Sequence, residues 1–228
     1  MEVLAIIPAR GGSKGVPRKN LRPVGGRSLL ATCVASARGA TLVSRVCVST
    51  DDDEIAAAAI AAGAEVVRRP AEISGDAASS ESALLHALSA LEAAEGYRPD
   101  ILAFLQCTSP FVMPEDVDGA IALVADGRAD SALTAFRSDL FLWRLDEGAG
   151  AVGINHDKSR RPLRQERSPE FAENGAVYAM RVPGFVEARH RFFGKTLIHE
   201  MPRERSLEID AEEDLTLANA LFLAMGLG

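Results

Sequence analysis

The chain has 228 residues, of which 47% are hydrophobic and 25% charged, and its 25 basic and 32 acidic residues give a formal net charge of −7. This length suffices for one large domain with its own core, while the acidic balance argues against a general nucleic-acid binder, which needs a basic face. No apolar run approaches the roughly 18 residues of a membrane helix, and the start of the chain lacks a basic signal region. We expect a cytoplasmic protein that binds neither nucleic acid nor membrane.

The first half of the chain alternates short apolar runs with helix-like stretches. Continuous apolar runs, typical of strands buried on both faces of a parallel sheet, lie at residues 3–8, 45–49 and 101–105. Helix formers ended by glycine, or begun by proline and acids, indicate helices. These helices are expected at 29–38, 54–62, 82–94 and from Pro114 onward. The βαβ order predicts an α/β fold with a mostly parallel sheet flanked by helices.

The composition of the sequence changes after a further apolar run at residues 131–136. From 137 to 200, arginine, proline, histidine and glycine are dense, and periodicity is weak outside 176–180. This segment holds too many aromatic and leucine residues for a solvated tail. We predict a single domain of residues 1–228 with a small inserted subdomain at 137–200 that packs on the core or on a second subunit. A closing helix is expected at 214–227.

The loop after the first apolar run carries the strongest functional signal. Residues 9–20 bring three glycines and four cationic side chains together. Glycines let backbone N–H groups approach an anion, and Arg10, Lys14 and Lys19 can offset the roughly four negative charges of a nucleoside triphosphate. The loop has neither the Lys-Ser/Thr pair of a Walker loop nor a dinucleotide fingerprint. We predict a polyphosphate site here, with a solvated basic loop as the alternative.

Acidic residues near the end of the chain suggest a metal site. Glu208 and Asp210 flank Ile209 in an extended-looking stretch, so a period of two sends both carboxylates to one face. Carboxylate oxygens are the ligands that Mg²⁺ prefers. Asp210 can instead cap the closing helix, and the two roles can coexist. Asp51 fits a nucleotide or metal ligand and an ordinary helix start equally well.

Several motifs together resemble those of one enzyme family. Residues 7–15 (IPARGGSKG), followed by Pro17, Lys19 and Asn20, look like the signature of the CMP-sialic acid synthetases, the N-acylneuraminate cytidylyltransferases. Further motifs follow in that family's order at 48–51, 69–72, 76–80, 105–110, 174–178 and 209–210. The resemblance covers nearly the whole chain. It implies a Rossmann-like nucleotidyltransferase core that transfers CMP from CTP to the anomeric hydroxyl of a nonulosonic (sialic) acid and releases pyrophosphate.

The resemblance also implies a cofactor, a partner and site residues. It implies Mg²⁺ (or Mn²⁺) and a homodimer whose inserted segment, a dimerisation and sugar-binding subdomain, reaches the partner's sugar pocket. It assigns catalysis to Arg10, Lys14, Lys19 and Asp210, and the metal to Asp210 and Glu208. It assigns CTP binding to Arg10, Gly12, Ser13, Lys14, Lys19, Asn20, Arg69 and Ser80. It assigns the sugar to Gln106, Thr108, Ser109, Arg164, Asn174, Phe192 and Phe193.

The residues alone allow other interpretations of some of these positions. Arg69 reads as a surface arginine before a turn-forming proline, and Ser79-Ser80 as a helix cap. Residues 106–109 can form a plain turn before Pro110. Core or dimer packing explains residues 192–193 equally well.

The sequence also departs from the family pattern. Glu208 stands where the family usually has aspartate, Ala172 where it commonly has arginine, and residues 138–144 lack its usual His/Pro/Lys pattern. The identity of the acceptor sugar therefore stays open. The alternatives are the same chemistry on Kdo or another acceptor, or a non-catalytic nucleotide-binding protein. Residues 17–21 (PRKNL) differ from the Pro-Gly-Lys-Pro-Leu run of Kdo synthetases, which favours a nonulosonate.

Overall fold

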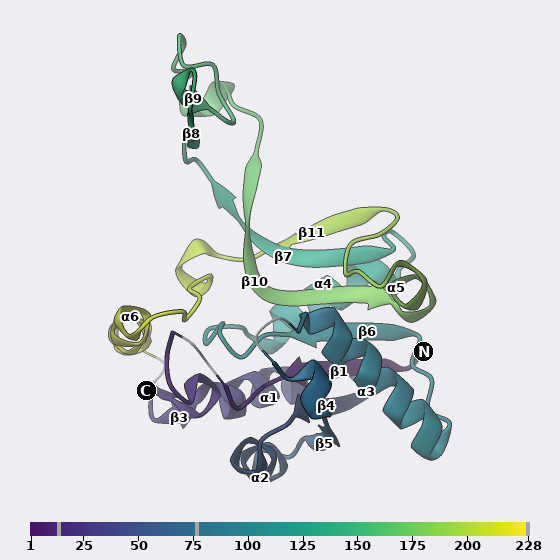
Figure 1. The fold of residues 1–228 in the computed structure, drawn as a ribbon. Helices are drawn as coiled ribbons and strands as arrows, with labels where there is room; N and C mark the ends of the chain where they lie inside the picture. The colour runs from purple at the N-terminus through teal and green to yellow at the C-terminus, as the bar shows by residue number, and fades with distance from the viewer. Residues whose placement is uncertain (13–14, 76–77, 227–228) are drawn as a thin grey trace.

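A seven-stranded sheet forms the centre of the computed structural model, which describes residues 1–12, 15–75 and 78–226. The strand order is β11-β7-β10-β6-β1-β4-β5, and only β10 runs antiparallel to its neighbours (Figure 1). These strands are β1 (Val3–Pro8), β4 (Arg45–Thr50), β5 (Glu65–Arg68), β6 (Ile101–Leu105), β7 (Ser131–Ser138), β10 (Glu170–Arg181) and β11 (Thr196–Glu200). The predicted mostly parallel α/β fold is confirmed.

Helices cover both faces of this sheet because alternate residues of the central strands face opposite sides. Val3, Ala5 and Ile7 of β1 belong to one core, whereas Leu4 and Ile6 belong to another. The first core is covered by α1 (Leu29–Gly39), α2 (Asp53–Ala61), α4 (Pro114–Ala125) and α6 (Glu212–Ala224). The second is covered by α3 (Ser80–Glu95) and α5 (Val182–Ala188). The chain thus forms three layers, with the continuous apolar runs in the middle layer.

Side-chain caps fix where the helices after β4 and β5 begin. The Asp52 carboxylate accepts a hydrogen bond from the Ile55 backbone N–H at 2.9 Å, and the Ser79 hydroxyl accepts one from the Ser82 N–H at 3.2 Å. Each cap satisfies a backbone donor that the first helical turn leaves unpaired. Because β4 and β5 are parallel, α2 and α3 both begin at the carboxyl edge of the sheet.

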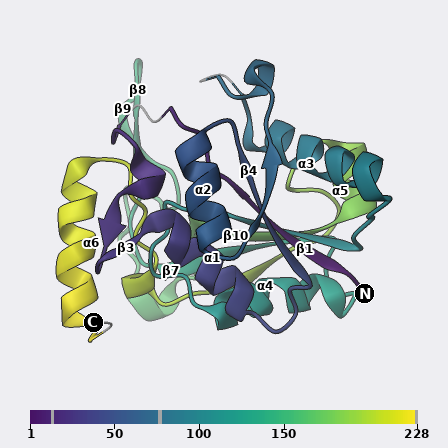
Figure 2. The same cartoon turned by 90° about the horizontal axis from the view of Figure 1, so that it is seen from below.

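A small hairpin of β2 (Pro23–Val24) and β3 (Arg27–Ser28) lies beside α6 (Figure 2). Its turn needs glycine at Gly25, which has a φ of +58° and lies so close to Phe222 that a Cβ would come within 2.2 Å of the ring. The Gly25 N–H also donates to the Asn219 side chain at 3.1 Å. The hairpin therefore holds the last helix against the loop after β1. In the described residues, no helix combines the length and apolar character that crossing a membrane requires.

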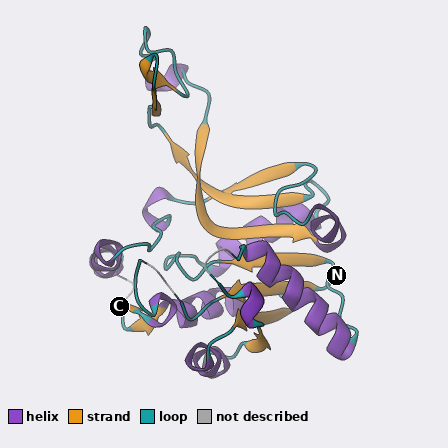
Figure 3. Cartoon of the chain, viewed as in Figure 1, coloured by secondary structure: helices purple, strands orange, loops and turns teal. Residues whose placement is uncertain are grey.

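Residues 139–169 leave the sheet as a projecting segment, called the arm here (Figure 1, Figure 3). The arm contains the antiparallel pair β8 (Trp143–Asp146) and β9 (Gly150–Gly153), and a short 3-10 turn at Arg164–Glu166. The expected insertion at 137–200 is too wide, because β10 and β11 belong to the central sheet. The apolar pattern of β10 is interrupted where its register shifts, and β11 alternates exposed with half-buried residues.

Candidate active site

The candidate site lies at the carboxyl edge of the sheet, where α/β folds usually bind ligands. The loops after β1, β4, β5 and β6 all leave the sheet on this side, which is the side of α6 in Figure 1. Residues 206–210 return to the same edge, because the Ile209 N–H donates to the carbonyl oxygen of Thr108 at 2.8 Å. Five segments far apart in the sequence therefore meet here.

Polar bonds fix the described part of the glycine-rich loop. The buried Asn20 amide donates to the carbonyl oxygen of Arg10 at 3.1 Å, and the Gly11 N–H donates to the Asp51 carboxylate at 3.1 Å. Asp51 thus holds the loop after β1 to the end of β4. Ser13 and Lys14, both expected at the triphosphate, lie outside the described residues.

The four cations of the loop do not all have the same role. The Arg18 guanidinium donates to Asp52 at 2.8 Å and also pairs with Glu54 at the start of α2. Arg18 has a left-handed φ of 57°, which turns the chain just before the 3-10 turn at Lys19–Leu21. Its charge therefore anchors the loop to α2.

Arg69 is buried, so the expectation of a surface arginine is wrong, although the expected turn does follow at Pro70. Only 8% of its surface is exposed, and its guanidinium donates to the Ser49 carbonyl at 2.6 Å and to the Ser49 hydroxyl at 3.2 Å. Burial lowers the pKa of Arg69, nearby Asp51 opposes that change, and Arg10 adds to it. Arg10, Asp51 and Arg69 therefore share one electrostatic environment at the ends of β1, β4 and β5.

Ser79 and Ser80 separate into two roles. Ser79 is the N-cap of α3, so the helix-cap interpretation holds for this residue. Ser80 is the first residue of the helix and is half-buried at the same edge of the sheet. Its expected contact with cytidine stays a prediction.

The acidic segment contacts the loop after β1 directly. The Lys19 ammonium donates to the Asp210 carboxylate at 3.0 Å and to the Ile209 carbonyl at 2.8 Å. The Thr108 hydroxyl donates to the Glu208 carboxylate at 3.2 Å. Ile209 is fully buried, whereas Glu208 is half-buried and Asp210 exposed. The structure thus brings Lys19, Thr108, Glu208 and Asp210 together.

The two carboxylates also affect each other electrostatically. Burial raises the pKa of Glu208, and the neighbouring charge of Asp210 raises it further. The helix-capping alternative for Asp210 is wrong, because Asp214 accepts the N–H groups of Asp210 and Ala211 at 2.9 and 2.8 Å. Across residues 1–12, 15–75 and 78–226, no group of three or more His, Cys, Asp or Glu side chains is placed to hold a metal ion.

Gly15 lets the loop approach the acidic segment closely. A Cβ at this position would lie 2.1 Å from the carbonyl oxygen of Asp210. We expect Gly15→Ala to lower the midpoint of thermal unfolding by about 5 °C, because one of the two backbones must move. Calorimetry of the variant tests this. Gly148→Ala is the control, since the nearest atom to its added Cβ is 3.8 Å away; equal midpoints for both variants would contradict the close approach.

Gln106 and Glu208 both reach the backbone at Gly175. A Cβ on Gly175, whose φ is +66°, would lie 3.3 Å from the Gln106 side-chain oxygen and 3.2 Å from a Glu208 carboxylate oxygen. This glycine lies where the register between β10 and β7 shifts. The irregularity bends β10 away from β6, while residues 170–173 stay paired with β7.

Asn174 and Ser109 have internal roles in the structure. Asn174 is buried; its oxygen accepts the Thr134 hydroxyl at 2.7 Å, and its amide donates to the Ser206 hydroxyl at 3.0 Å. It therefore stabilises the bend of β10. Ser109 is 3% exposed, and its hydroxyl has no hydrogen-bond partner among the described residues. Their expected sugar contacts stay predictions.

The two adjacent phenylalanines point to different places. The Phe192 ring meets Tyr178 edge-on, with centroids 5.9 Å apart. Phe193 packs against Gly184 and lines a hollow with Arg98 and Arg181 at the opposite, amino edge of the sheet. The structure therefore packs Phe192 on Tyr178 at the second core and Phe193 at the amino edge, and the expected sugar contact of Phe192 stays a prediction.

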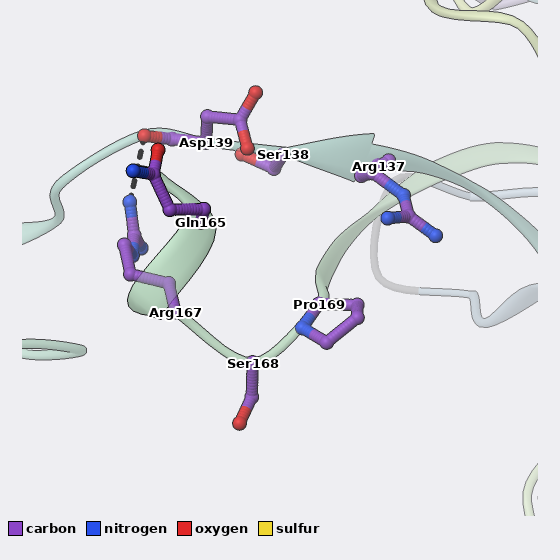
Figure 4. Close-up of a pocket in the computed structure, with 7 residues that line it drawn as sticks. All are labelled: Arg137, Ser138, Asp139, Gln165, Arg167, Ser168 and Pro169. Carbon is purple, nitrogen blue, oxygen red and sulfur yellow. Dashed lines mark hydrogen bonds between the residues drawn. The ribbon is translucent and has the colours of Figure 1, made fainter. Parts of the chain in front are cut away.

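Arg164 belongs to the arm, and its side chain is outside the described part of the structure. A cavity of about 400 Å³ lies next to it at the base of the arm. Figure 4 shows its lining, in which the Arg167 guanidinium donates to the carbonyl oxygen of Asp139 at 2.8 Å. This bond ties together the two segments of the chain that enter and leave the arm, at the point where they leave the sheet.

Arg191 also lies near this part of the structure, and nothing in the sequence points to it. Its Nε donates to the Glu81 carboxylate at 2.7 Å. Its guanidinium carbon lies 5.0 Å from the ring centroid of Phe104 and 4.6 Å from that of Tyr178. Because Glu81 is 110 residues away in the sequence, no local pattern could reveal the pair.

Sequence comparisons place this architecture among known proteins. The family described as Cytidylyltransferase matches residues 4–180. N-acylneuraminate cytidylyltransferase A of Danio rerio is 33% identical over 98% of this chain and 51% of its own length. The N-acylneuraminate cytidylyltransferase of Escherichia coli O18:K1:H7 (strain RS218 / NMEC) is 31% identical over 95% of this chain and 51% of its own length. The chain spans about half the length of the curated relatives it matches.

Solved structures share the fold at lower identity. A CMP:2-keto-3-deoxy-manno-octonic acid synthetase complexed with CTP is 18% identical, with a TM-score of 0.71 over 99% of this chain and 100% of the other. A 4-diphosphocytidyl-2C-methyl-D-erythritol synthase from Anaerococcus prevotii DSM 20548 is 15% identical, with a TM-score of 0.69 over 97% and 98% of the two chains. The resemblance seen in the motifs is confirmed, and the chain belongs to the cytidylyltransferase family.

Proposed function

We propose that the chain transfers CMP from CTP to the anomeric hydroxyl of a nonulosonic, sialic-type acid and releases pyrophosphate. The observation that carries the proposal is the meeting of Lys19, from the glycine-rich loop, with the acids Glu208 and Asp210. A phosphate-binding loop beside a pair of carboxylates suits metal-assisted phosphoryl transfer. The relatives named N-acylneuraminate cytidylyltransferase support the acceptor class.

Glu208 and Asp210 fit a hard divalent cation, and we propose Mg²⁺ (or Mn²⁺) as the cofactor. Their carboxylates are close enough for the charge of Asp210 to raise the pKa of the half-buried Glu208, a repulsion that a cation between them relieves. Two protein carboxylates suffice, because Mg²⁺ is commonly completed by waters and substrate phosphates. When bound, the cation would neutralise charge that develops on the phosphoryl oxygens.

The residues of the chain have separate tasks in the proposed reaction. Lys19 can exchange its bond to Asp210 for a phosphate oxygen of CTP, which frees that carboxylate for the cation. Arg10, close to buried Arg69, adds positive charge at the end of β1. Glu208, held by the Thr108 hydroxyl, stays aimed at the same space. The loop thus binds and orients the triphosphate while the acids face the α-phosphate.

A homodimer in which the arm meets the partner is also part of the proposal. The arm exposes large apolar side chains that include Leu142, Trp143 and Leu145, which are 48%, 50% and 89% exposed. An exposed apolar group of this kind is typical of an interaction surface. The arm also carries Arg164, so a partner's sugar site is a suitable place for that residue. The use of CTP suits a cytoplasmic setting.

Lys19→Ala is expected to weaken the use of CTP far more than it weakens the fold. We expect the KM for CTP to rise about tenfold or more, because one charge-assisted contact to phosphate is lost. The free energy of unfolding should change by about 1 kcal/mol or less, since an ion pair with an exposed partner contributes little. Steady-state kinetics and urea unfolding measure the two effects. Equal losses in both would contradict a phosphate-binding role.

Pyrophosphate release tests the proposed function directly. The assay combines the chain, CTP and Mg²⁺ with N-acetylneuraminate, legionaminate, pseudaminate, deaminated neuraminate or Kdo in separate reactions. Turnover with a nonulosonate is the expected result. Turnover with Kdo alone would mean that the acceptor is Kdo and not a nonulosonate, while the transfer of CMP would stand. If no acceptor leads to pyrophosphate release although CTP binds, the result would favour a non-catalytic nucleotide-binding protein.

A further inference from the structure

A half-buried ion pair links α3 to the loop that follows α5. The side chains of Arg191 and Glu81 are only 18% and 12% exposed, and the Arg191 Nε donates to Glu81 at 2.7 Å. The guanidinium also lies near the rings of Phe104 and Tyr178, which stack on each other 5.2 Å apart. Burying a charged pair is costly, and a neutral apolar pair would fill this position at lower cost. Packing alone therefore does not explain why a charged pair occupies this position.

This pair borders the proposed active site. Gln106 is two residues beyond Phe104, so it extends from the same face of the sheet as the Arg191 contact. The Tyr178 hydroxyl donates to the Glu173 carboxylate at 2.5 Å. After burial and Asp210, Glu173 is a further charge that raises the pKa of Glu208. Glu81 follows Ser80 at the start of α3. Arg191 is thus linked to Glu81 at the start of α3 and, through the Tyr178 ring and its hydroxyl, to Glu173.

We propose that Arg191 is a specificity-determining residue for the acceptor, whose guanidinium, held by Glu81 over Tyr178, donates hydrogen bonds to an uncharged oxygen substituent of the sugar acid. This inference rests on the proposed function. Arginine suits the task because its planar fork presents several donors while its face stacks on an aromatic ring. Glu81 fixes the orientation of that fork before the acceptor binds, which lowers the entropy cost of recognition.

The charges around Arg191 indicate which part of the acceptor it meets. Glu81 already neutralises the guanidinium, and Glu173 lies at the far side of Tyr178. A carboxylate approaching this point would meet two acidic side chains, whereas a carbonyl or hydroxyl oxygen would meet donors without repulsion. The acid group of the sugar is therefore expected elsewhere in the site.

The test separates acceptor recognition from CTP binding and from folding. In the pyrophosphate assay, R191L should raise the KM for the acceptor about tenfold or more and leave the KM for CTP within about twofold. R191K, which keeps the charge and loses the planar fork, should fall between R191L and the wild type. If R191L folds poorly, R191K alone still gives the comparison.

Arg45 offers a matched control at the opposite edge of the sheet. It lies 4.4 Å from the Tyr97 ring and pairs with Glu65 and Glu95, at 2.5 and 2.7 Å. R45L therefore removes a similar stacked and paired arginine, and it should lower stability without changing the KM for the acceptor. An acceptor KM that rises no more in R191L than in R45L would overturn the inference. So would equal rises in the KM values for acceptor and CTP.

Calorimetric titration of the sugar acids keeps the inference testable if the wild type shows no turnover. The absence of turnover counts against the proposed function. Binding of N-acetylneuraminate or another panel acid to the wild type, weakened at least about tenfold in R191L and unchanged in R45L, would still support the role of Arg191. Equal binding by the wild type and R191L, or binding of no panel acid, would overturn it.

Discussion

Asp210→Ala should lower turnover about a thousandfold while the protein stays folded and still binds CTP. The carboxylate is exposed, and its one hydrogen bond in the described structure comes from Lys19, so its removal costs the fold little. Loss of the proposed cation ligand would remove several kcal/mol of transition-state stabilisation, and each 1.4 kcal/mol is about a factor of ten in rate. CTP keeps its contacts with the loop, so binding weakens less than turnover.

Single-turnover kinetics and calorimetric titration with CTP and Mg²⁺ measure these two effects. Glu212→Gln is the control, because Glu212 is a nearby acid that forms a surface pair with Arg22 at 2.6 Å. It should retain nearly full turnover. Asp210→Asn keeps the shape and loses the charge, so it should resemble Asp210→Ala. Full turnover by both Asp210 variants would exclude a metal role for this residue and favour a different acid.

The layers of the fold could be predicted because their strands are buried on both faces. β1, β4 and β6 are continuous apolar runs, and the helices between them end within two residues of the expected positions. The apolar pattern does not predict β5, because this strand is short and mostly outside the core. The sequence predicts β10 only in part, because its first residues, 170–173, pair with β7 on the way from the arm and lack a continuous apolar pattern. Local pattern thus predicts the central elements well and the peripheral ones poorly.

The candidate site was predictable only where one loop carries several of its members. The loop after β1 can be recognised in the sequence because its glycines and cations lie in one short run. Arg69 reads locally as a surface residue, but the fold buries it and brings its guanidinium to Ser49 of β4. Arg191 and Glu81 pair across two elements. Such contacts result from the tertiary fold, so one sequence without the fold does not reveal them.

Asp116→Asn should destabilise the protein by about 3 kcal/mol, because it breaks a buried ion pair. Asp116 is 2% exposed; it accepts the Met113 N–H at 2.9 Å and one Arg205 N–H at 2.9 Å, and it forms a second bond to Arg205. Arg205 lies three residues before Glu208. The pair therefore ties the acidic segment to α4, and its loss should reduce turnover together with stability.

The pH dependence of this variant gives an independent check. Burial alone would raise the pKa of Asp116, but the bonds to His199 and Arg205 outweigh it and hold the pKa below its ordinary range. A depressed pKa in the folded state stabilises the protein above the unfolded pKa, and this contribution is lost as the pH falls through the folded value. The difference in unfolding free energy between wild type and Asp116→Asn should therefore shrink below about pH 4.

Urea unfolding from pH 7 to pH 3 measures this difference, with Glu115→Gln as the exposed control on the same helix. The control should stay within about 0.5 kcal/mol of the wild type at every pH. A constant difference for Asp116→Asn down to pH 3 would mean that packing, and not the charge of Asp116, holds α4 to the acidic segment. A difference that shrinks on acidification would show that the charge of Asp116 supplies this stability.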